Sequence, residues 1–301
     1  MVDDLEVVVH QIHLIDGTFE LFRAYYSFPK VKNSEGKEIG AVLGLVSNTL
    51  RLCKQKGVTH LAAAFDHVIE SFRNQLFPGY KTGEGIDPDL YQQFHVAEKA
   101  IRALGIVVWP MVEFEADDAI ATAAHRFSSG ADVSKVVICS PDKDFAQLVQ
   151  SKIVLWDRIR NQMYDSQGVV EKFGVAPGSI PDWLALVGDT SDGIPGLPRF
   201  GAKTASALLS KYPHLEDIPG NIEQWEVDIR GKEGLNKTLR SRWQDVLLFR
   251  KLATLRLDVP ITEQIGDLFW KGVNRDLIGA LGREIPWTLL DDEMLNIPDS
   301  R

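Results

Sequence analysis

The sequence predicts an α/β fold in which a mostly parallel central sheet is flanked by helices and followed by a C-terminal helical domain. Two observations predict it. Over the first two thirds of the chain, strand-like and helix-like segments alternate, as they do where helices connect parallel strands. From about residue 166 the strand signals fade, and short segments with helical periodicity follow one another. We therefore predict an α/β core over residues 1–170 and a helical domain over residues 171–301.

The core is predicted from apolar, strand-like segments and from segments with apolar residues at helical spacing. The strand segments, in chain order, are 6–16, 59–66, 106–112, 134–142 and 153–157. The helical segments are 39–57, 89–105 and 115–127, and the first two end at Gly57 and Gly105, where glycine commonly stops a helix. Between the second strand and the second helix, residues 78–90 are polar and rich in Gly and Pro, which predicts an exposed, mobile loop.

The composition excludes several classes of protein. Hydrophobic residues make up 45% and charged residues 25% of the chain, which is typical of a globular protein rather than a disordered one. No apolar run reaches the ~18 residues that a membrane span needs, and no basic stretch starts a secretory signal. The two cysteines, Cys53 and Cys139, exclude a disulfide framework. We therefore expect a cytoplasmic protein with no membrane partner, and a monomer.

Charge is distributed unevenly along the chain. The formal net charge is −9 and the pI about 5.3, which by itself argues against a nucleic-acid-binding protein. Residues 230–251, however, hold seven Lys or Arg against two acids. This basic segment, which includes Arg240 and Arg242, predicts either a surface for nucleic-acid phosphates or a solvated helix face.

Carboxylates follow several of the predicted strands. Because the carboxyl ends of parallel strands meet at one edge of a sheet, these side chains are expected to gather there. Any one of them is also explained as an ordinary helix N-cap, but together they repel one another and need cations. Oxygen ligands with no sulfur and few imidazoles favour Mg²⁺ or Mn²⁺ over Zn²⁺. The acids of this predicted metal site are Asp16, Asp66, Glu115, Asp117, Asp118, Asp142 and Asp144.

A second signal lies in residues 188–212. Asp189 and Asp192 are three residues apart, and a turn from Gly196 to Gly201 leads into a predicted helix that starts with Lys203 and Thr204. Main-chain N–H groups at such a helix start can hold a phosphate, and Lys203 and Thr204 favour that interpretation. The alternative is that the glycines serve tight packing between two helices.

The sequence contains no GxSxG, GxxxxGK[ST], GxGxxG or HExxH pattern. This excludes serine-hydrolase, P-loop, Rossmann and zinc-protease interpretations. His67, which follows Asp66, is expected to be a loop residue.

These motifs, in this order, resemble the 5′-nuclease family, which includes the 5′→3′ exonuclease domain of bacterial DNA polymerase I, phage 5′-exonucleases and flap endonucleases. The resemblance runs from about residue 10 to residue 260. It rests on LIDGTFELFRAYYSFP (14–29), AAFD (63–66), FRNQLFPGYK (72–81), EADDAIATAA (115–124), SPDKDFAQLV (140–149) and LVGDTSDGIPGLPRFGAKTASALL (186–209). It implies a PIN-like nuclease core with a helix–hairpin–helix at about 188–212. The implied activity is Mg²⁺-dependent 5′→3′ exonuclease and flap endonuclease cleavage of DNA at single-strand/duplex junctions or 5′ ends, leaving 5′-phosphates.

The resemblance also implies roles for individual residues. Asp189 and Asp192 join the seven acids named above as ligands of two or more divalent ions. Loop 78–90 corresponds to the helical arch that a single strand threads. Lys81 and Arg73 are implied as catalytic residues near the scissile phosphate. Relatives also bind K⁺ at the hairpin. The residues implied in DNA binding are Arg23, Tyr80, Lys81, Gly196, Arg199, Gly201, Lys203, Thr204, Arg240 and Arg242.

Three positions depart from the family pattern. Glu84 stands near the place of a second arch arginine, Pro141 replaces a glycine, and Gly193 replaces an asparagine. No polymerase domain follows, so a free-standing nuclease is expected.

Two alternatives stay open. One is a PIN-class RNase, which would have fewer acids and no 188–212 hairpin. The other is a catalytically inactive DNA-junction-binding protein, which loss of one or more acids would mark.

Overall fold

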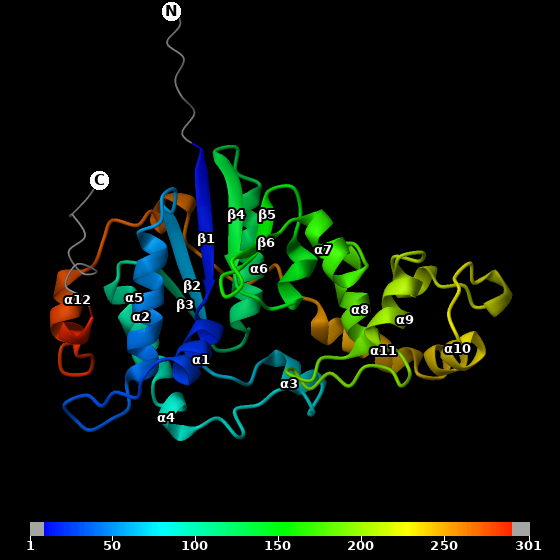
Figure 1. Ribbon diagram of the computed structural model, residues 1–301, viewed down its shortest axis with the longest axis horizontal. Helices are drawn as coiled ribbons and strands as arrows, with labels where there is room; N and C mark the ends of the chain where they lie inside the picture. The colour runs from blue at the N-terminus through cyan, green and yellow to red at the C-terminus, as the bar shows by residue number, and fades with distance from the viewer. Residues whose placement is uncertain (1–8, 291–301) are drawn as a thin grey trace, which may run out of the picture. The chain divides into compact units, whose positions relative to one another are not determined.

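A computed structural model describes residues 9–290 (Figure 1). The chain divides into two compact units. Unit 1 holds residues 1–69, 83–140 and 257–301, and unit 2 holds residues 70–82 and 141–256. The prediction placed one boundary at 170/171, whereas the chain crosses between these two units four times. Residues 6–8 of the first predicted strand lie outside the described residues.

Unit 1 contains a parallel sheet. Its strands are β1 (His10–Asp16), β2 (His60–Asp66), β3 (Val107–Met111) and β4 (Val133–Cys139), in the order β3-β2-β1-β4. Every residue of β2 is buried, as expected for an inner strand covered on both faces. Because β1 pairs with β2 in parallel, with Asp16 opposite Ala64, the two strands end side by side. The predicted parallel sheet is confirmed.

Helices of unit 1 lie between the strands of this sheet and after its last strand in the chain (Figure 1). They are α1 (Gly17–Ser27), α2 (Gly40–Cys53), α4 (Pro88–Tyr91), α5 (Phe94–Ala103), α6 (Ala116–Ser128) and α12 (Arg275–Ala280), with 3-10 turns at Ile265–Leu268 and Trp287–Leu289. The sequence patterns missed α1, which begins directly at the end of β1. Its start is stabilised by Asp16, whose carboxylate accepts a hydrogen bond from the amide of Phe19 at 2.9 Å. The predicted helix over 89–105 is divided into α4 and α5.

Residues 257–290 belong to unit 1 and pack within it. The indole of Trp270 donates to the carbonyl of Leu104 at 2.7 Å, and the amide of Asn274 donates to the carbonyl of Ala103 at 2.8 Å. Gly105, which ends α5, has a φ of +76°, and a Cβ there would lie 2.1 Å from the carbonyl oxygen of Gly272. Glycine is therefore required at position 105 both by backbone conformation and by the close approach of this segment.

We expect Gly105→Ala to lower the free energy of unfolding by more than about 1 kcal/mol, since the left-handed backbone and the clash with Gly272 both oppose a side chain. Gly279→Ala in α12 is the matched control, because a Cβ at Gly279 would point into open space. Urea unfolding of both variants measures the difference. Equal stabilities would contradict the proposed packing at Gly105.

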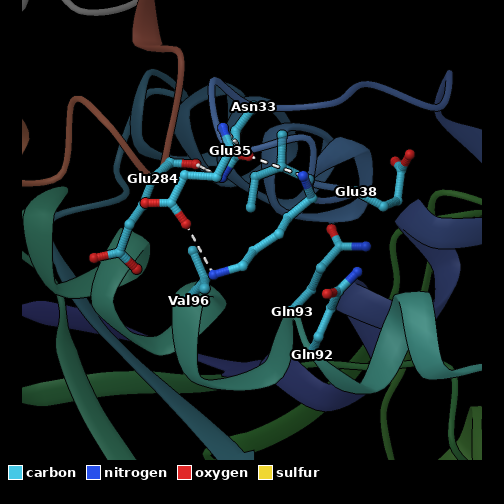
Figure 2. A pocket seen from close by; sticks show the side chains of 9 residues that line it. Asn33, Glu35, Glu38, Gln92, Gln93, Val96 and Glu284 are labelled. Atoms are coloured by element: carbon cyan, nitrogen blue, oxygen red, sulfur yellow. Dashed lines mark hydrogen bonds and ion pairs between the residues drawn. The ribbon is translucent and has the colours of Figure 1, made fainter.

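A polar pocket lies in unit 1 beside the C-terminal segment (Figure 2). Lys37 pairs with Glu35 at 2.8 Å on its rim, and the amide of Asn33 donates to the carbonyl of Glu284 at 3.1 Å. None of the site residues predicted from the sequence lines it. The lining residues are Asn33, Glu35, Lys37, Glu38, Ile39, Gln92, Gln93, Val96 and Glu284.

Unit 2 is mainly helical, as predicted for the second half of the chain. Its helices are α3 (Phe72–Leu76), α7 (Ser166–Phe173), α8 (Ile180–Val187), α9 (Ala202–Leu209), α10 (Lys232–Ser241) and α11 (Trp243–Ala253). It also holds an antiparallel hairpin, β5 (Ile153–Asp157) and β6 (Gln162–Tyr164), and 3-10 turns at Asp144–Leu148, Pro177–Ser179, Leu215–Asp217 and Ile222–Gln224. Within residues 9–290, none of the helices has the length and apolar character that a bilayer crossing requires.

An ion-pair network ties α8 to α11. The carboxylate of Asp182, which is 2% exposed, lies 2.9 Å from both Arg250 and His214. Arg250 also forms a two-pronged pair with Glu216. Its hydrogen bond with Glu216, followed by the one with Asp182, raises the pKa of the Arg250 guanidinium against the opposing effect of burial. One cation of the predicted basic segment therefore serves the packing of unit 2.

Candidate active site

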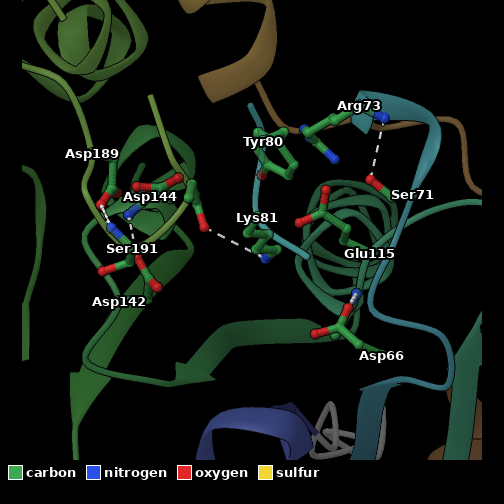
Figure 3. Close-up of polar contacts among 12 residues, drawn as sticks. Asp66, Ser71, Arg73, Tyr80, Lys81, Glu115, Asp142, Asp144, Asp189 and Ser191 are labelled. Carbon is green, nitrogen blue, oxygen red and sulfur yellow. Dashed lines mark hydrogen bonds and ion pairs between the residues drawn. The ribbon is translucent and has the colours of Figure 1, made fainter. Parts of the chain in front are cut away.

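The acids of unit 1 lie where its strands end, as the sequence predicts. Asp16 ends β1 and is 4% exposed, and its second carboxylate oxygen accepts a hydrogen bond from the hydroxyl of Ser140 at 2.8 Å. Asp66 ends β2, and its carboxylate accepts from the amide of Ala116 at 2.8 Å (Figure 3). The amide of Asp66 in turn donates to the hydroxyl of Thr18 at 2.8 Å. These bonds join the first turns of α1 and α6 to the two strand ends.

Glu115, Asp117 and Asp118 stand at the start of α6. Glu115 and Asp118 form a capping box, in which each side chain accepts from the main-chain amide of the other. Both are essentially inaccessible, at 1% and 0% exposed, whereas Asp117 is half-buried. The N-cap explanation is thus correct for this pair. It does not exclude the metal-ligand role, because a carboxylate has lone pairs for more than one partner.

The acids of unit 2 form a tighter cluster. Asp144, Asp189 and Asp192 each offer a carboxylate oxygen, and these oxygens all lie within 4.8 Å of one another. Asp142 accepts from the amide of Asp144 at 2.9 Å. Figure 3 shows Asp142, Asp144 and Asp189 turned toward a common region, with Ser191 donating to Asp189. Sequence reasoning missed the cation of this cluster: Lys143, which pairs with Asp189 at 2.5 Å. Lys143 lies between Asp142 and Asp144 in the sequence, and that position could have indicated a cation close to the predicted metal ligands.

The electrostatics of this cluster favour a bound cation. Burial, and then the charges of Asp142, Asp192 and Asp189, hold the pKa of the Asp144 carboxyl well above its usual range. One oxygen of Asp144, Oδ1, is buried without a hydrogen-bond partner among residues 9–290. A buried, unpartnered carboxylate oxygen that faces other acids is costly unless an ion satisfies it. The residues present therefore fit a divalent cation with oxygen ligands.

The loop between α8 and α9 presents Asp189 and Asp192. Main-chain hydrogen bonds of 2.8 Å in both directions between Asp189 and Ile194 close it into a small turn. Gly193 has a φ of +72°, and a Cβ there would lie 2.2 Å from the carbonyl oxygen of Gly79. The glycine at this departure from the family pattern is therefore required by the close approach of residues 79–81.

Lys81 lies beside this loop. Its amide donates to the carbonyl of Asp192 at 3.0 Å, and its ammonium group lies 3.6 Å from the Asp192 carboxylate (Figure 3). The Lys81 side chain is 22% exposed, so the ammonium is both anchored and accessible. This placement agrees with a role near a phosphate, which stays a prediction.

Two residues predicted beside Lys81 lie in the interior instead. Tyr80 is 4% exposed, so its ring is not available to stack on a base, and that prediction is wrong for this structure. Arg73 is 1% exposed and donates to the carbonyls of Leu252 and Thr254 at 2.8 and 3.1 Å. The Arg73 guanidinium thus satisfies carbonyls at the end of α11. We replace its predicted catalytic contact with a positioning role.

The predicted phosphate-binding turn is partly accessible. Gly201 is the N-cap of α9, and Gly201 and Lys203 are exposed, while Thr204 is half-buried. Gly196, in contrast, is buried in the loop. Arg199 has a left-handed φ of +75°. Its guanidinium packs against the start of α10, so closely that a Cβ at Gly234 would lie 2.2 Å from a guanidinium nitrogen.

Several predicted DNA-binding cations already have partners within their own unit. Arg23 pairs with the buried Glu20. Arg240 donates to the carbonyls of Ile218 and Pro219 at 2.7 and 2.9 Å, and Arg242 pairs with Asp245 at 2.8 Å. These bonds favour the solvated-face interpretation for Arg240 and Arg242. The basic segment keeps three exposed cations with no partner among the described residues, namely Arg230, Lys237 and Lys251.

Two family models match the chain. The model of the 5′-3′ exonuclease N-terminal resolvase-like domain matches residues 11–174, and that of the 5′-3′ exonuclease C-terminal SAM fold matches residues 175–276.

Curated proteins and solved structures are also similar. A 5′-3′ exonuclease of Buchnera aphidicola is 33% identical, over 86% of this chain and 91% of that protein. DNA polymerase I of Pseudomonas aeruginosa is 38% identical over 94% of this chain, which spans only 31% of that longer protein. A structure of the bacteriophage T5 D15 flap endonuclease with DNA and metal ions aligns with a TM-score of 0.62. That alignment covers 95% of this chain and 97% of the other at 19% identity, and it supports the fold alone.

Proposed function

The chain belongs to the 5′-3′ exonuclease family, and from that premise we propose that it is a divalent-metal-dependent 5′→3′ exonuclease and flap endonuclease of DNA. The observation that carries the metal dependence is the buried Asp144 carboxylate, whose unpartnered oxygen lies among Asp142, Asp189 and Asp192. Relatives named as 5′-3′ exonucleases support the activity, and the fold is shared with a structure named as a flap endonuclease with DNA and metal ions.

We propose the acids of both units as ligands, with Mg²⁺ as the physiological ion and Mn²⁺ as a substitute. Bound ions supply positive charge at the scissile phosphate and make a water molecule nucleophilic at neutral pH. The chain's own groups orient the reaction. Hydrogen bonds hold Asp16 and Asp66 at the strand ends, so both carboxylates are fixed in direction and keep lone pairs for an ion.

Cations of unit 2 complement the acids in this proposal. The Lys81 ammonium would face the scissile phosphate, where a fixed positive charge stabilises the transition state. Lys143 neutralises part of the charge of Asp189 without occupying the unpartnered oxygen of Asp144. The turn that opens α9 would hold the phosphates of the duplex backbone. We also propose that K⁺ binds at this turn. The proposed cellular location of the protein is the cytoplasm.

Two other functions were compatible with the sequence. A catalytically inactive junction-binding protein is disfavoured because all nine predicted acids are present. A PIN-class RNase is disfavoured because the second family model, over residues 175–276, includes the 188–212 segment that such a protein would lack.

A flap duplex labelled at its 5′ end tests the proposal. With Mg²⁺ we expect both short exonuclease products and an oligonucleotide of the flap's length, and with EDTA we expect neither. An all-RNA flap serves as the comparison substrate. Absence of cleavage with every divalent ion tried would overturn the enzymatic proposal, and faster cleavage of the RNA flap would favour the RNase.

Salt dependence tests which cations contact phosphate. We expect the double variant Arg230→Gln/Lys237→Gln to flatten the slope of log affinity for a duplex against log salt by about 0.9 per lost contact. Arg242→Gln is the matched control, since its guanidinium is already paired with Asp245, and its slope is expected to be unchanged. If only the control changes the slope, the assignment of the exposed cations is wrong.

A further inference from the structure

Unit 1 holds a second cluster of metal-ligating side chains, made of His67, His95 and Glu98. His67 directly follows β2, and His95 and Glu98 lie three residues apart on α5, so they share one face of that helix. The cluster is separate from the acids described above. The neighbouring Asp66 carboxylate accepts from Ala116, whereas the His67 ring turns to Glu98.

The three side chains are in contact. Nδ1 of His67 lies 2.8 Å from Oε1 of Glu98, and the rings of His67 and His95 have centroids 4.3 Å apart, tilted by 45°. One possible ligand atom from each residue lies within 4.8 Å of the other two. Zinc ligands lie about 2.0–2.1 Å from the ion, so in a tetrahedral site they are roughly 3.3–3.5 Å from one another. A small rotation of the exposed His95 side chain would bring the three ligand atoms to such distances.

Burial and charge favour an ion over a simple His–Glu hydrogen bond. The Glu98 side chain is only 5% exposed, and its other oxygen lies 3.6 Å from Arg102, which is 40% exposed. A hydrogen bond between His67 and Glu98 needs no second imidazole, yet His95 packs its ring on that of His67. His67 is 36% exposed and His95 is exposed, which leaves an entry path and room for a water ligand.

We propose that His67, His95 and Glu98 bind a divalent transition-metal ion of the zinc type. Two imidazoles and one carboxylate form a ligand set that zinc uses in proteins, with a fourth position left for water. Imidazole selects such ions over Mg²⁺, which prefers oxygen ligands, so this site and the acidic clusters take different metals. The ion would join the end of β2 to α5, the helix that follows the 82–93 segment, and thereby stabilise unit 1.

Metal titration of the full chain in excess Mg²⁺, without DNA, tests this site independently of any nuclease activity. Co²⁺ replaces zinc in such sites and reports four-coordinate binding through intense visible absorption, which octahedral oxygen sites lack. We expect this absorption with the wild type, its displacement by Zn²⁺, and a rise in melting temperature when Zn²⁺ is added. For His95→Ala we expect Zn²⁺ affinity to fall at least ~10–100-fold, with loss of the absorption and of the thermal shift.

Two further variants keep the test sharp. His125→Ala removes an exposed histidine of α6 and is expected to bind as the wild type does. Glu98→Gln keeps the size of the side chain but weakens it as a ligand, so reduced affinity is expected. Absence of four-coordinate absorption in the wild type, or equal Zn²⁺ affinities for wild type and His95→Ala, would overturn the proposal.

Discussion

Asp144→Asn is expected to lower the cleavage rate by about three orders of magnitude and, in EDTA, to raise the melting temperature. Ions in such sites contribute several kcal/mol to transition-state stabilisation, and each 1.36 kcal/mol corresponds to a factor of ten in rate. The amide is isosteric with the carboxylate but carries no charge to hold a cation. Single-turnover rates on a flap substrate measure the loss. Asp118→Asn and Asp142→Asn are expected to show the same loss of rate.

The stability effect of Asp144→Asn follows from the raised pKa of Asp144, caused first by its burial and then by Asp142, Asp192 and Asp189. The folded state binds this proton more tightly than the unfolded state, so charging the group opposes folding. Without metal, the contribution of Asp144 to stability therefore falls as the pH rises from the ordinary value of 3.8 through the raised pKa. The asparagine variant has no carboxyl to charge, so its stability does not fall in this way as the pH rises. Bound Mg²⁺ should likewise abolish this fall in stability in the wild type.

Thermal melts over a pH series, with EDTA and with Mg²⁺, provide the measurement. Asp228→Asn is the control, because Asp228 is an exposed acid of the same unit with no partner among residues 9–290, and no change in rate or stability is expected. Near-normal cleavage by Asp144→Asn, or a lower melting temperature in EDTA, would show that Asp144 is a structural residue and not a metal ligand.

Lys81→Ala is expected to slow cleavage about 10²–10³-fold, the usual cost of removing one preorganised group from a transition state, with little loss of duplex affinity. The ammonium is held 3.6 Å from the Asp192 carboxylate, whereas the main chain of residue 81 is anchored by its own hydrogen bond to Asp192. The substitution therefore removes the charge and leaves the loop in place. The rate of a single turnover and the affinity for a plain duplex separate the two effects.

Lys211→Ala provides the control for Lys81, since Lys211 is also an ion-paired lysine of unit 2, bound to Glu226 at 2.6 Å. Its cleavage rate is expected to be unchanged. Glu84→Arg supplies a complementary gain: it restores positive charge to the 78–90 loop and is expected to speed flap cleavage at low salt, with the gain fading as salt screens it. If Lys81→Ala and wild type cleave equally fast, the arch comparison does not extend to Lys81.

Local sequence was sufficient for the features that depend on neighbouring residues. Runs of apolar residues located the strands, because each inner strand of a parallel sheet is buried on both faces. Acids placed directly after those runs predicted the positions of Asp16 and Asp66, since parallel strands present their carboxyl ends at one edge. The parallel α/β core and the helical second half therefore followed from residue order alone, whereas the nuclease activity was implied by the family resemblance.

Only the tertiary structure decided which partner each side chain has. The family resemblance implied substrate contacts for Arg73 and Tyr80, but both side chains are buried, and Arg73 donates to carbonyls 179 and 181 residues away. The return of residues 257–290 to unit 1, and the meeting of His67 with Glu98, likewise join segments far apart in sequence. Periodicity encodes how a segment folds and which face it buries. The burial of a charge, and the group that compensates it, are set by long-range packing that no local pattern records.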